Sequence, residues 1–338
     1  MINYFQIKLR CFQSFYNTSI MPYKHNQDRR HKFKKSKYKV TNWSDYNESL
    51  RKRGDITIWF SDDTITGWHP EKISGKRGRP QKYSESAIEC CLMLRQVYGL
   101  PLRQTQGFTY SLINLMGLEI KAPDYSCISK RSVSLELKRL IDNIKQGSHV
   151  IVDSTGLKVY GKDEWYQEKH NVKARRTWRK LHLGIDENHQ IIACDLTDKS
   201  VGDTTALDNL FDQIEEFDTF MGDGAYDGDS VYKKILDKST NAIIAVPPPK
   251  NAVEKSSAFD QRNSHTDFIA KHGRMAWQRS TDYGLRAYAE LAMLRYKTII
   301  GPKLKAREIP QQKTESQISV RVLNIMTKLG MPISVKAA

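Results

Sequence analysis

The chain has 338 residues, of which 39% are hydrophobic, and it carries a formal net charge of +16. This length suffices for two domains or for one large domain with appendages. The positive charge indicates a polyanionic partner, either nucleic acid or an anionic membrane surface. No run approaches the roughly 18 apolar residues of a membrane-spanning helix, and the mean hydropathy is −0.60. Nucleic acid, and no membrane, is therefore the favoured partner.

The N-terminal part of the chain is strongly basic. Residues 1–20 are expected to form a disordered leader, because Lys8 and Arg10 interrupt its apolar run and no small-residue cleavage site follows. Residues 21–53 contain eleven Lys or Arg residues against three acids, and Met21 is an alternative start. Such a tail is solvated when free and can contact DNA by neutralising phosphates.

Residues 21–82 are interpreted as a basic tail and linker, with the sequence Arg-Gly-Arg-Pro at 77–80. Arg77 and Arg79 resemble the core of an AT-hook, an extended arginine pair that lies in a narrow A·T minor groove. A linker punctuated by Gly and Pro before a domain is the alternative interpretation.

Cysteine spacing bears on the compartment. The five cysteines are odd in number and never show Cys-x-x-Cys spacing. Neither a disulfide framework nor a zinc site is indicated. We expect a protein of the reducing cytoplasm, associated with the nucleoid.

Residues 83–145 show helical periodicity and are predicted to form a helical DNA-binding domain. Ser84 is a candidate N-cap for a helix that ends at Gly99-Leu100-Pro101. Two short helices are expected at 102–110 and 112–118, and a further helix begins near Tyr125. This order is typical of a helix-turn-helix, whose second helix reads the major groove; an ordinary helical subdomain is the alternative. The reading side chains would be Tyr125, Ser126, Ser129, Lys130 and Arg131.

Residues 146–302 alternate strands and helices and are predicted to form an α/β domain. Asp153 and Asp223 each follow a short apolar run that indicates a buried strand. Burying an ionised carboxylate without a partner costs several kcal/mol, and a metal ion would supply that partner. The expected strands are 149–153, 157–160, 181–186, 191–196, 220–223 and 242–246, with helices at 204–216 and 230–238. Residues 247–281 are expected to be an irregular insertion, and residues 303–338 a C-terminal tail.

A helix is predicted from Tyr283 onward. At about 100° per residue, Arg286, Glu290 and Lys297 project within an arc of about 60°. The opposite face is apolar, so the helix can bury one side and present a carboxylate framed by cations. An ordinary ion pair of Arg286 with Glu290, four residues apart, is the alternative. The apolar face consists of Leu285, Ala289, Ala292, Tyr296 and Ile299.

A second basic cluster precedes the third predicted strand. Glu168 is the one acid among its cations. We interpret the cluster as a patch that contacts the DNA backbone, with a solvated hairpin as the alternative. Its members are Lys169, Lys173, Arg175, Arg176, Arg179 and Lys180.

Three motifs together carry a resemblance to a known family. They are Asp153-Ser-Thr-Gly, Asp223-Gly-Ala-Tyr-Asp, and Tyr-x2-Arg-x3-Glu-x6-Lys at Tyr283, Arg286, Glu290 and Lys297. In this combination the chain resembles the DDE transposases of bacterial insertion sequences, in the branch with the Tyr-Arg-Glu-Lys signature. The resemblance extends from Gly75 through most of the remaining chain.

The resemblance implies a ribonuclease-H-like mixed sheet flanked by helices, with the helix-turn-helix-like region N-terminal to it. It also implies that Asp153, Asp223 and Glu290 are the catalytic residues and hold two Mg²⁺ ions, for which Mn²⁺ substitutes. Arg286 and Lys297 would contact phosphates, and Tyr283 a phosphate at the end of the element. Trp277 would stack on an unpaired base, although simple packing is an equal alternative.

The expected activity has two steps on double-stranded DNA. Hydrolysis at terminal inverted repeats frees 3′-hydroxyl ends, which then attack target DNA in the same site. Because two ends must be brought together, a homodimer or a larger assembly is expected. Two other classes stay open: a nuclease of the same core fold that cuts without joining, and a DNA-binding protein descended from a transposase.

Overall fold

The computed structural model describes residues 37–70, 80–135, 137, 148–159, 178–253 and 260–337. The chain forms two compact units. The smaller unit comprises Met1–Tyr46 and Pro332–Ala338, and the larger comprises Asn47–Met331. None of the helices in the described ranges is long and apolar enough to cross a membrane.

The smaller unit brings two distant parts of the chain together. Strand β1 (Tyr38–Val40) pairs in antiparallel fashion with β8 (Ser334–Lys336), so that Tyr38 lies opposite Lys336. The amide of Ile333 also donates to Asn42 Oδ1 at 2.7 Å. Helix α2 (Trp43–Lys52) leads from this unit into the larger one.

The larger unit begins with a group of helices that surround a core rich in aromatic residues, including Trp59 and Trp68. Ser84 caps α5 as predicted, since its hydroxyl accepts from the Ala87 amide at 3.1 Å. The two short helices expected at 102–118 form a single helix, which continues until Gly117 adopts φ of 64°. The helices are α3 (Ile56–Trp59), α4 (Asp62–Thr66), α5 (Glu85–Val97), α6 (Leu102–Leu115) and α7 (Tyr125–Arg131).

A mixed sheet with strand order β4-β3-β2-β5-β6 forms the centre of the larger unit, which confirms the predicted fold class. Strands β2, β3 and β4 are antiparallel, whereas β5 and β6 run parallel to β2. The short β7 pairs with the far end of β2. The strands are β2 (His149–Val159), β3 (Trp178–Ile185), β4 (Ile191–Asp198), β5 (Thr219–Met221), β6 (Ile243–Ala245) and β7 (Lys303–Leu304).

One expectation about the sheet was wrong. Residues 149–153 and 157–159 belong to a single strand, β2, instead of two. The physical reason is that β3 pairs with β2 without interruption from Ile151 to Lys158, so Asp153 and its neighbours have no freedom to form a turn. Tyr160, the last residue of the expected second strand, lies outside the described residues.

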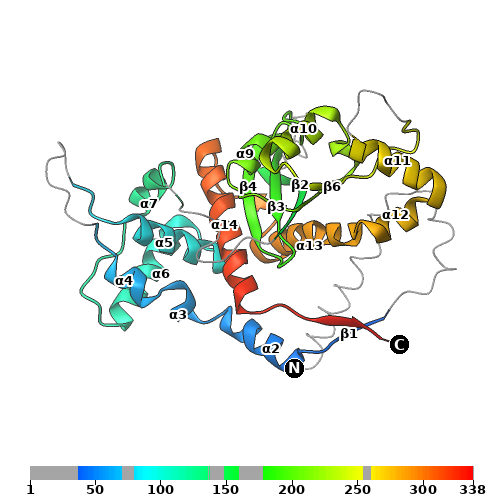
Figure 1. Ribbon diagram of the computed structural model, residues 1–338. Helices are drawn as coiled ribbons and strands as arrows, with labels where there is room; N and C mark the ends of the chain where they lie inside the picture. The colour runs from blue at the N-terminus through cyan, green and yellow to red at the C-terminus, as the bar shows by residue number, and fades with distance from the viewer. Residues whose placement is uncertain are drawn as a thin grey trace, which may run out of the picture. The chain divides into compact units, whose positions relative to one another are not determined.

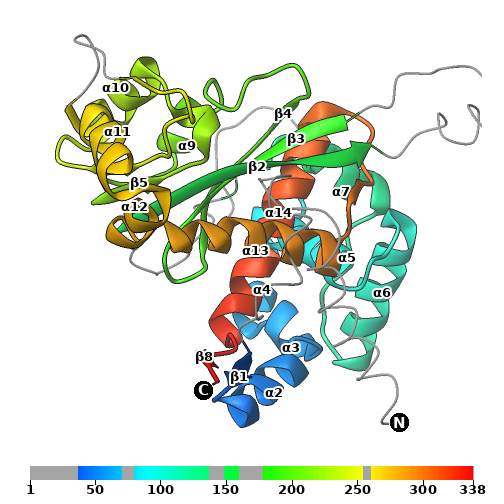
Figure 2. The ribbon, with the colours of Figure 1, turned by 90° about the vertical axis from the view of Figure 1, so that its right-hand side faces the viewer.

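Helices cover both faces of the sheet (Figures 1 and 2). On one face, α9 (Leu207–Phe211) and α10 (Asp229–Lys238) pack on Val150 and Val152. On the other, α13 (Ala287–Arg295) and α14 (Ile309–Leu329) pack on Ile151. Because side chains alternate along a strand, Asp153 lies on the same face as Ile151, toward α13.

Two segments expected to be irregular are helical. The 247–281 stretch contains α11 (Asp260–His272) and α12 (Arg274–Ser280). The expected tail contains α14, whose Ile318, Val322 and Met326 join the helical core while Val320 and Leu323 join the sheet core. Its two apolar faces explain why α14 is buried between these layers rather than exposed.

Candidate active site

Strands β2 and β5 bring two of the predicted acids together. Val150 lies opposite Phe220, and Ile151 opposite Met221. The paired residues end two positions before Asp153 and Asp223, and the two acids are close enough to interact electrostatically. Asp153 was expected at a strand end, but it lies inside β2. The neighbour β5 ends at Met221, which leaves room beside the Asp153 side chain.

Asp223 is held by the turn that follows β5. Its Oδ1 accepts the Ala225 amide at 2.9 Å and so caps a short 3₁₀ helix (Gly224–Tyr226). Gly222 precedes it at a close approach, because a Cβ at that position would lie 2.7 Å from the ring of Tyr226. The turn chemistry therefore requires a glycine immediately before the acid.

Glu290 comes from the predicted helix, which is less regular than expected. It starts with a 3₁₀ turn (Tyr283–Arg286), continues as α13, and ends with a π-helical turn (Tyr296–Ile300). Ala289, Ala292 and Tyr296 are buried as predicted. Ile299 is 37% exposed, contrary to the prediction, because the wider π-helical turn changes the spacing of side chains along the helix.

Arg286 bridges two of the three acids. Its guanidinium lies 3.0 Å from Asp153 Oδ2 and 2.5 Å from Glu290 Oε1. The predicted pair of Arg286 with Glu290 therefore exists, and Arg286 also links α13 to β2. The side chains of Arg286 and Asp153 are 22% and 16% exposed, whereas that of Glu290 is 44% exposed.

The electrostatics of Asp153 reflect the two other acids. Burial raises the pKa of Asp153, and the nearby Asp223 and Glu290 raise it further. The Arg286 guanidinium opposes this shift by favouring the charged carboxylate. The cluster therefore concentrates negative charge that one arginine partly balances.

The donor set has the chemistry of a site for a hard divalent ion. Carboxylate oxygens are the ligands that Mg²⁺ prefers. In the described part of the chain no three His, Cys, Asp or Glu side chains already converge closely enough to hold a metal. Arg286 instead contacts oxygens of Asp153 and Glu290, so an ion would compete with this guanidinium for them.

Trp277 and Tyr283 have structural contacts within the protein, and their predicted DNA contacts stay predictions. Trp277 is 1% exposed and donates from Nε1 to His265 Nδ1 at 3.0 Å. This burial favours the packing alternative for Trp277. Tyr283 donates its single hydroxyl proton to the Gly222 carbonyl at 3.1 Å, and a phosphate oxygen would need that same proton. Burial raises the pKa of Tyr283 to about 12.

His265, Trp277 and Tyr283 form a chain of structural contacts that the sequence did not predict. His265 Nε2 lies 2.7 Å from the Ile244 carbonyl of β6, and the Trp277 ring packs on Tyr283 with centroids 5.2 Å apart. These contacts connect β6, α11, α12 and the start of the helix that carries Glu290. The polar 247–281 stretch has no periodicity that predicts these contacts. The presence of His265 and Trp277 within it was the one available signal.

Lys297 is half-buried, and burial lowers its pKa. Within the described ranges, its side-chain ammonium forms no hydrogen bond or ion pair. Its predicted phosphate contact stays a prediction.

The second basic cluster is largely outside the described residues, including Arg175 and Arg176, as are Arg77 and Arg79 of the linker. The two members that are described have acidic partners within the protein, and the predicted DNA contact of the cluster stays a prediction. Arg179 pairs with Asp198 at 2.7 Å, and Lys180 lies 3.4 Å from Asp203. The β3–β4 register explains the first pair, since it sets Arg179 directly opposite Asp198.

The predicted reading residues on α7 differ in their surroundings. Arg131 donates to the Tyr83 carbonyl at 2.9 Å, so this side chain is already engaged within the protein. The Tyr125 ring lies 4.7 Å from the Arg103 guanidinium. Ser126 and Lys130 are exposed and Ser129 is half-buried. A helix-turn-helix function for α6 and α7 stays a prediction.

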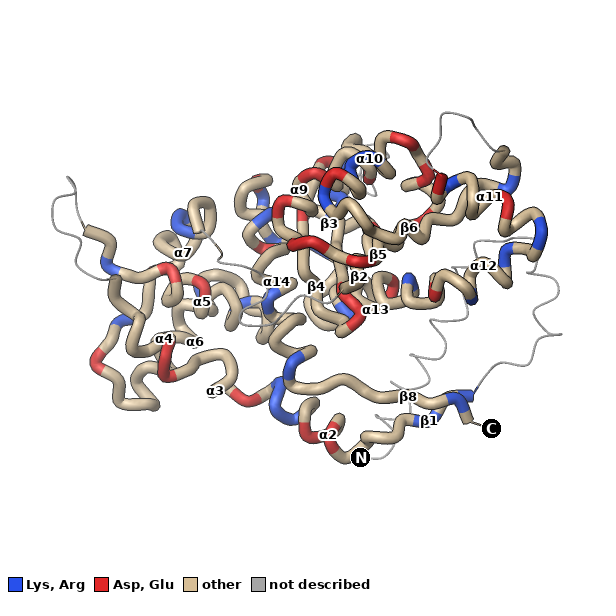
Figure 3. Tube along the Cα trace, in the orientation of Figure 1, with Lys and Arg blue, Asp and Glu red and all other residues tan. Residues whose placement is uncertain are grey.

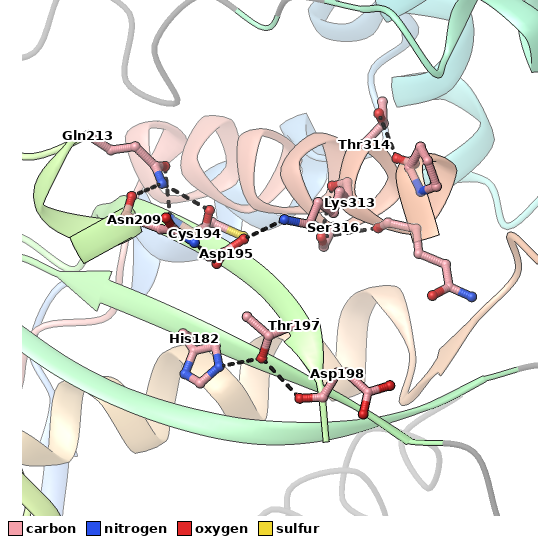
Figure 4. Close-up of polar contacts among 12 residues, drawn as sticks. His182, Cys194, Asp195, Thr197, Asp198, Asn209, Gln213, Lys313, Thr314 and Ser316 are labelled. Atoms are coloured by element: carbon pink, nitrogen blue, oxygen red, sulfur yellow. Dashed lines mark hydrogen bonds and ion pairs between the residues drawn. The ribbon is translucent and has the colours of Figure 1, made fainter. Parts of the chain in front are cut away.

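Other acids near the sheet have structural partners. Asp186 accepts the amides of Asn188 and Gln190, which is typical of a turn residue. Asp227 forms a buried double contact with Arg262. Figure 4 shows that Asp195 accepts from Asn209 and Lys313 at the edge of the sheet, near α14. The same view shows His182 bonded to Thr197.

Two family models with the description "Transposase DDE domain" match the chain, one over residues 51–162 and the other over residues 144–326. The second covers more than half of the sequence and includes Asp153, Asp223 and Glu290. A mixed α/β sheet covered by helices and bearing three clustered carboxylates is consistent with the core of such an enzyme. The chain belongs to the DDE transposase family, and it is accordingly an enzyme that cleaves DNA and transfers strands.

Proposed function

We propose that this protein is the transposase of an insertion sequence, in the Tyr-Arg-Glu-Lys branch. It binds the terminal inverted repeats, hydrolyses a phosphodiester at each end to free a 3′-hydroxyl, and joins that hydroxyl to target DNA. The observation that carries the proposal is the clustering of Asp153, Asp223 and Glu290, which come from β2, from the turn after β5 and from α13.

Asp153, Asp223 and Glu290 would hold two Mg²⁺ ions, with Mn²⁺ as a substitute. When bound, such ions supply an activated oxygen nucleophile and stabilise the charge of an in-line phosphoryl displacement. The chain contributes rigid positions for the three acids. Asp153 is fixed by the ladder with β3, and Asp223 by its cap on the Ala225 amide.

Arg286 and Lys297 are the proposed phosphate contacts. Arg286 offers a planar fork that suits two phosphate oxygens, and Lys297 a single point charge. Both lie on the helical segment that carries Glu290. Negative charge that develops on the non-bridging oxygens would therefore meet fixed cations.

The contacts of His265, Trp277 and Tyr283 position the helix that carries Glu290. Tyr283 ties the start of the segment to the carbonyl of Gly222, which directly precedes Asp223. We assign Tyr283 and Trp277 to positioning Glu290 relative to Asp223. Synapsis of two element ends implies a homodimer or a larger assembly on the DNA, in the cytoplasm at the nucleoid.

The test uses the purified full chain and DNA that carries the inverted repeats flanking its gene, with Mg²⁺ or with a chelator. Wild type should nick at the repeat ends and join them to target DNA only with the metal. Glu290→Gln should slow both steps at least about 100-fold, because a metal ligand is lost. Glu85→Gln, an exposed glutamate in the first turn of α5, makes the same chemical change away from the site and should act like wild type.

The alternatives predict different products. Cleavage without joining would favour a nuclease, and repeat binding without cleavage a DNA-binding descendant. Equal cleavage by Glu290→Gln and wild type would remove Glu290 from the proposed metal site.

A further inference from the structure

A cavity of about 370 Å³ lies where α5, α7 and the first turns of α14 meet the loop that follows β7. Its walls combine apolar side chains such as Leu92 and Ile318 with several cations and amides. A cavity of this size with a few convergent polar groups is typical of a ligand site. None of the three clustered acids lines it.

Arg95 is the most unusual residue of this cavity. It is 9% exposed, and its buried Nε has no hydrogen-bond partner among the described residues. Burial lowers its pKa, and Glu315 is the nearby group that opposes this shift. Glu315, however, is already occupied by the amides of Lys305 and Ala306 at 2.9 and 2.7 Å. A buried guanidinium without such partners costs several kcal/mol.

Two amide oxygens of the same cavity also lack partners. The side-chain oxygens of Gln96 and Gln311 are buried and have no hydrogen-bond partner in the part of the chain that the structure describes, and Gln96 is only 4% exposed. Buried polar groups are nearly always satisfied. Arg95 therefore offers the cavity an unused donor, and the two glutamine oxygens offer acceptors for a hydroxyl or amino group of a ligand.

The electrostatics of the cavity select an anion. Burial lowers the pKa of Lys305, and the neighbouring Arg95 lowers it further because the two cations repel each other. Arg307 adds a third cation to the lining, against Glu308 and the occupied Glu315.

A helix end adds to this field. Helix α14 is 21 residues long and begins here without a side-chain cap, so its first amides and its dipole favour negative charge. Arginine, lysine and a helix N-terminus together are the donors that bind phosphate.

We propose that this cavity is a phosphate-binding site, separate from the carboxylate cluster. The phosphate comes either from the backbone of bound DNA or from a free nucleotide. The DNA source rests on the proposed function and is favoured by α7, whose Ser129 lines the cavity while the adjacent Lys130 is exposed. A backbone phosphate held there would fix the register of α7 on the duplex.

The first measurement is calorimetric titration of the full chain with inorganic phosphate and with adenosine monophosphate. Wild type should bind at least one of these probes, and Arg95→Gln should bind it at least about tenfold more weakly. Because Arg95 is buried, the exposed Arg307→Gln provides a second variant that keeps the core intact. Lys233→Gln on α10, an equally exposed cation outside the cavity lining, is the matched control and should change affinity less than twofold.

The second measurement separates the two sources. Duplexes carrying the inverted repeat and one neutral methylphosphonate at successive positions are titrated by fluorescence anisotropy. If the site binds a DNA phosphate, a methylphosphonate at one position should lower the affinity of wild type about tenfold and leave the affinity of Arg307→Gln nearly unchanged. The slope of log affinity against log salt concentration should also be smaller by about one for Arg307→Gln than for wild type. For a nucleotide, adenosine monophosphate binds while no position discriminates wild type from variant.

The proposal is overturned if neither small probe binds and no methylphosphonate position separates the variants from Lys233→Gln. Glu290→Gln distinguishes failure of the phosphate-site proposal from failure of the proposed function. It should lose DNA cleavage while retaining wild-type affinity for phosphate, because Glu290 does not line the cavity.

Discussion

Replacing Arg286 by Met tests whether one guanidinium balances the carboxylate cluster. The change keeps an unbranched side chain of similar reach and removes the contacts to Asp153 at 3.0 Å and to Glu290 at 2.5 Å. Asp153 is 16% exposed, so its charge loses a partner where solvent compensates poorly. Glu290 is 44% exposed. Its ion pair with Arg286 contributes little to the free energy of unfolding, because solvent screens the interaction.

The expected cost is about 2 kcal/mol in the free energy of unfolding, below the 3–5 kcal/mol of a fully buried pair. For a chain of this size that corresponds to a melting temperature lower by about 4 °C in the presence of chelator. The loss should shrink at low pH. Burial already raises the pKa of Asp153, and removal of Arg286 raises it further. A raised carboxyl pKa costs stability only as pH rises above the unfolded value near 4.

Magnesium should narrow the difference in melting temperature between the two proteins, because tenfold tighter binding offsets at most about 1.4 kcal/mol of the loss. In wild type an ion must displace the guanidinium from the carboxylate oxygens, whereas in Arg286→Met it need not, so the variant should bind Mg²⁺ about tenfold more tightly. The assay is thermal unfolding in chelator and across a Mg²⁺ titration, with the exposed Arg279→Met as control. Equal melting temperatures in chelator, or equal Mg²⁺ midpoints, would refute the reasoning.

Three further predictions concern the packing around the site. Burial lowers the pKa of three histidines, so the unfolding free energy should be full above about pH 6.5 and fall as pH drops below it; urea unfolding of His265→Gln should show a weaker fall than wild type. The three are His182, His189 and His265. Gly222→Ala should cost about 1–3 kcal/mol through overlap with Tyr226, while Gly228→Ala, with open space around it, should cost clearly less; equal denaturation midpoints would contradict this. Asp227→Asn should destabilise by about 3–5 kcal/mol, because it leaves a buried arginine unpaired, whereas Asp267→Asn breaks a more exposed pair and should lower the melting temperature far less.

The sequence predicted those parts of the site whose signals are local. A serine before a helical run predicts a cap because the hydroxyl reaches an amide three residues on, and Ser84 forms that bond. Arg286 and Glu290 are four residues apart on a helix, and their pairing follows from helical geometry. Asp223 follows an apolar strand, and it lies in a turn after β5 as expected.

Features that depend on a distant partner could not be predicted in this way. Trp277 is buried because His265 and Tyr283 pack against it, and its own sequence neighbourhood does not predict these contacts. Arg179 is free or paired according to the register of β4. The chain end is a tail or a core helix according to whether two apolar surfaces are available for α14.

By itself, the sequence determined the fold class and the family, and it led to the prediction of the three acids, because these follow from local periodicity and from motifs of fixed spacing. Only the tertiary structure decided that Asp153 lies inside a continuous strand and that Arg286 joins it to Glu290. It also decided that Arg95, an ordinary residue of an amphipathic helix, is buried at a cavity with its Nε unpaired among the described residues. The physical reason is common to all three. Burial and pairing are properties of contacts between segments far apart in the chain, and no local pattern encodes which segments meet.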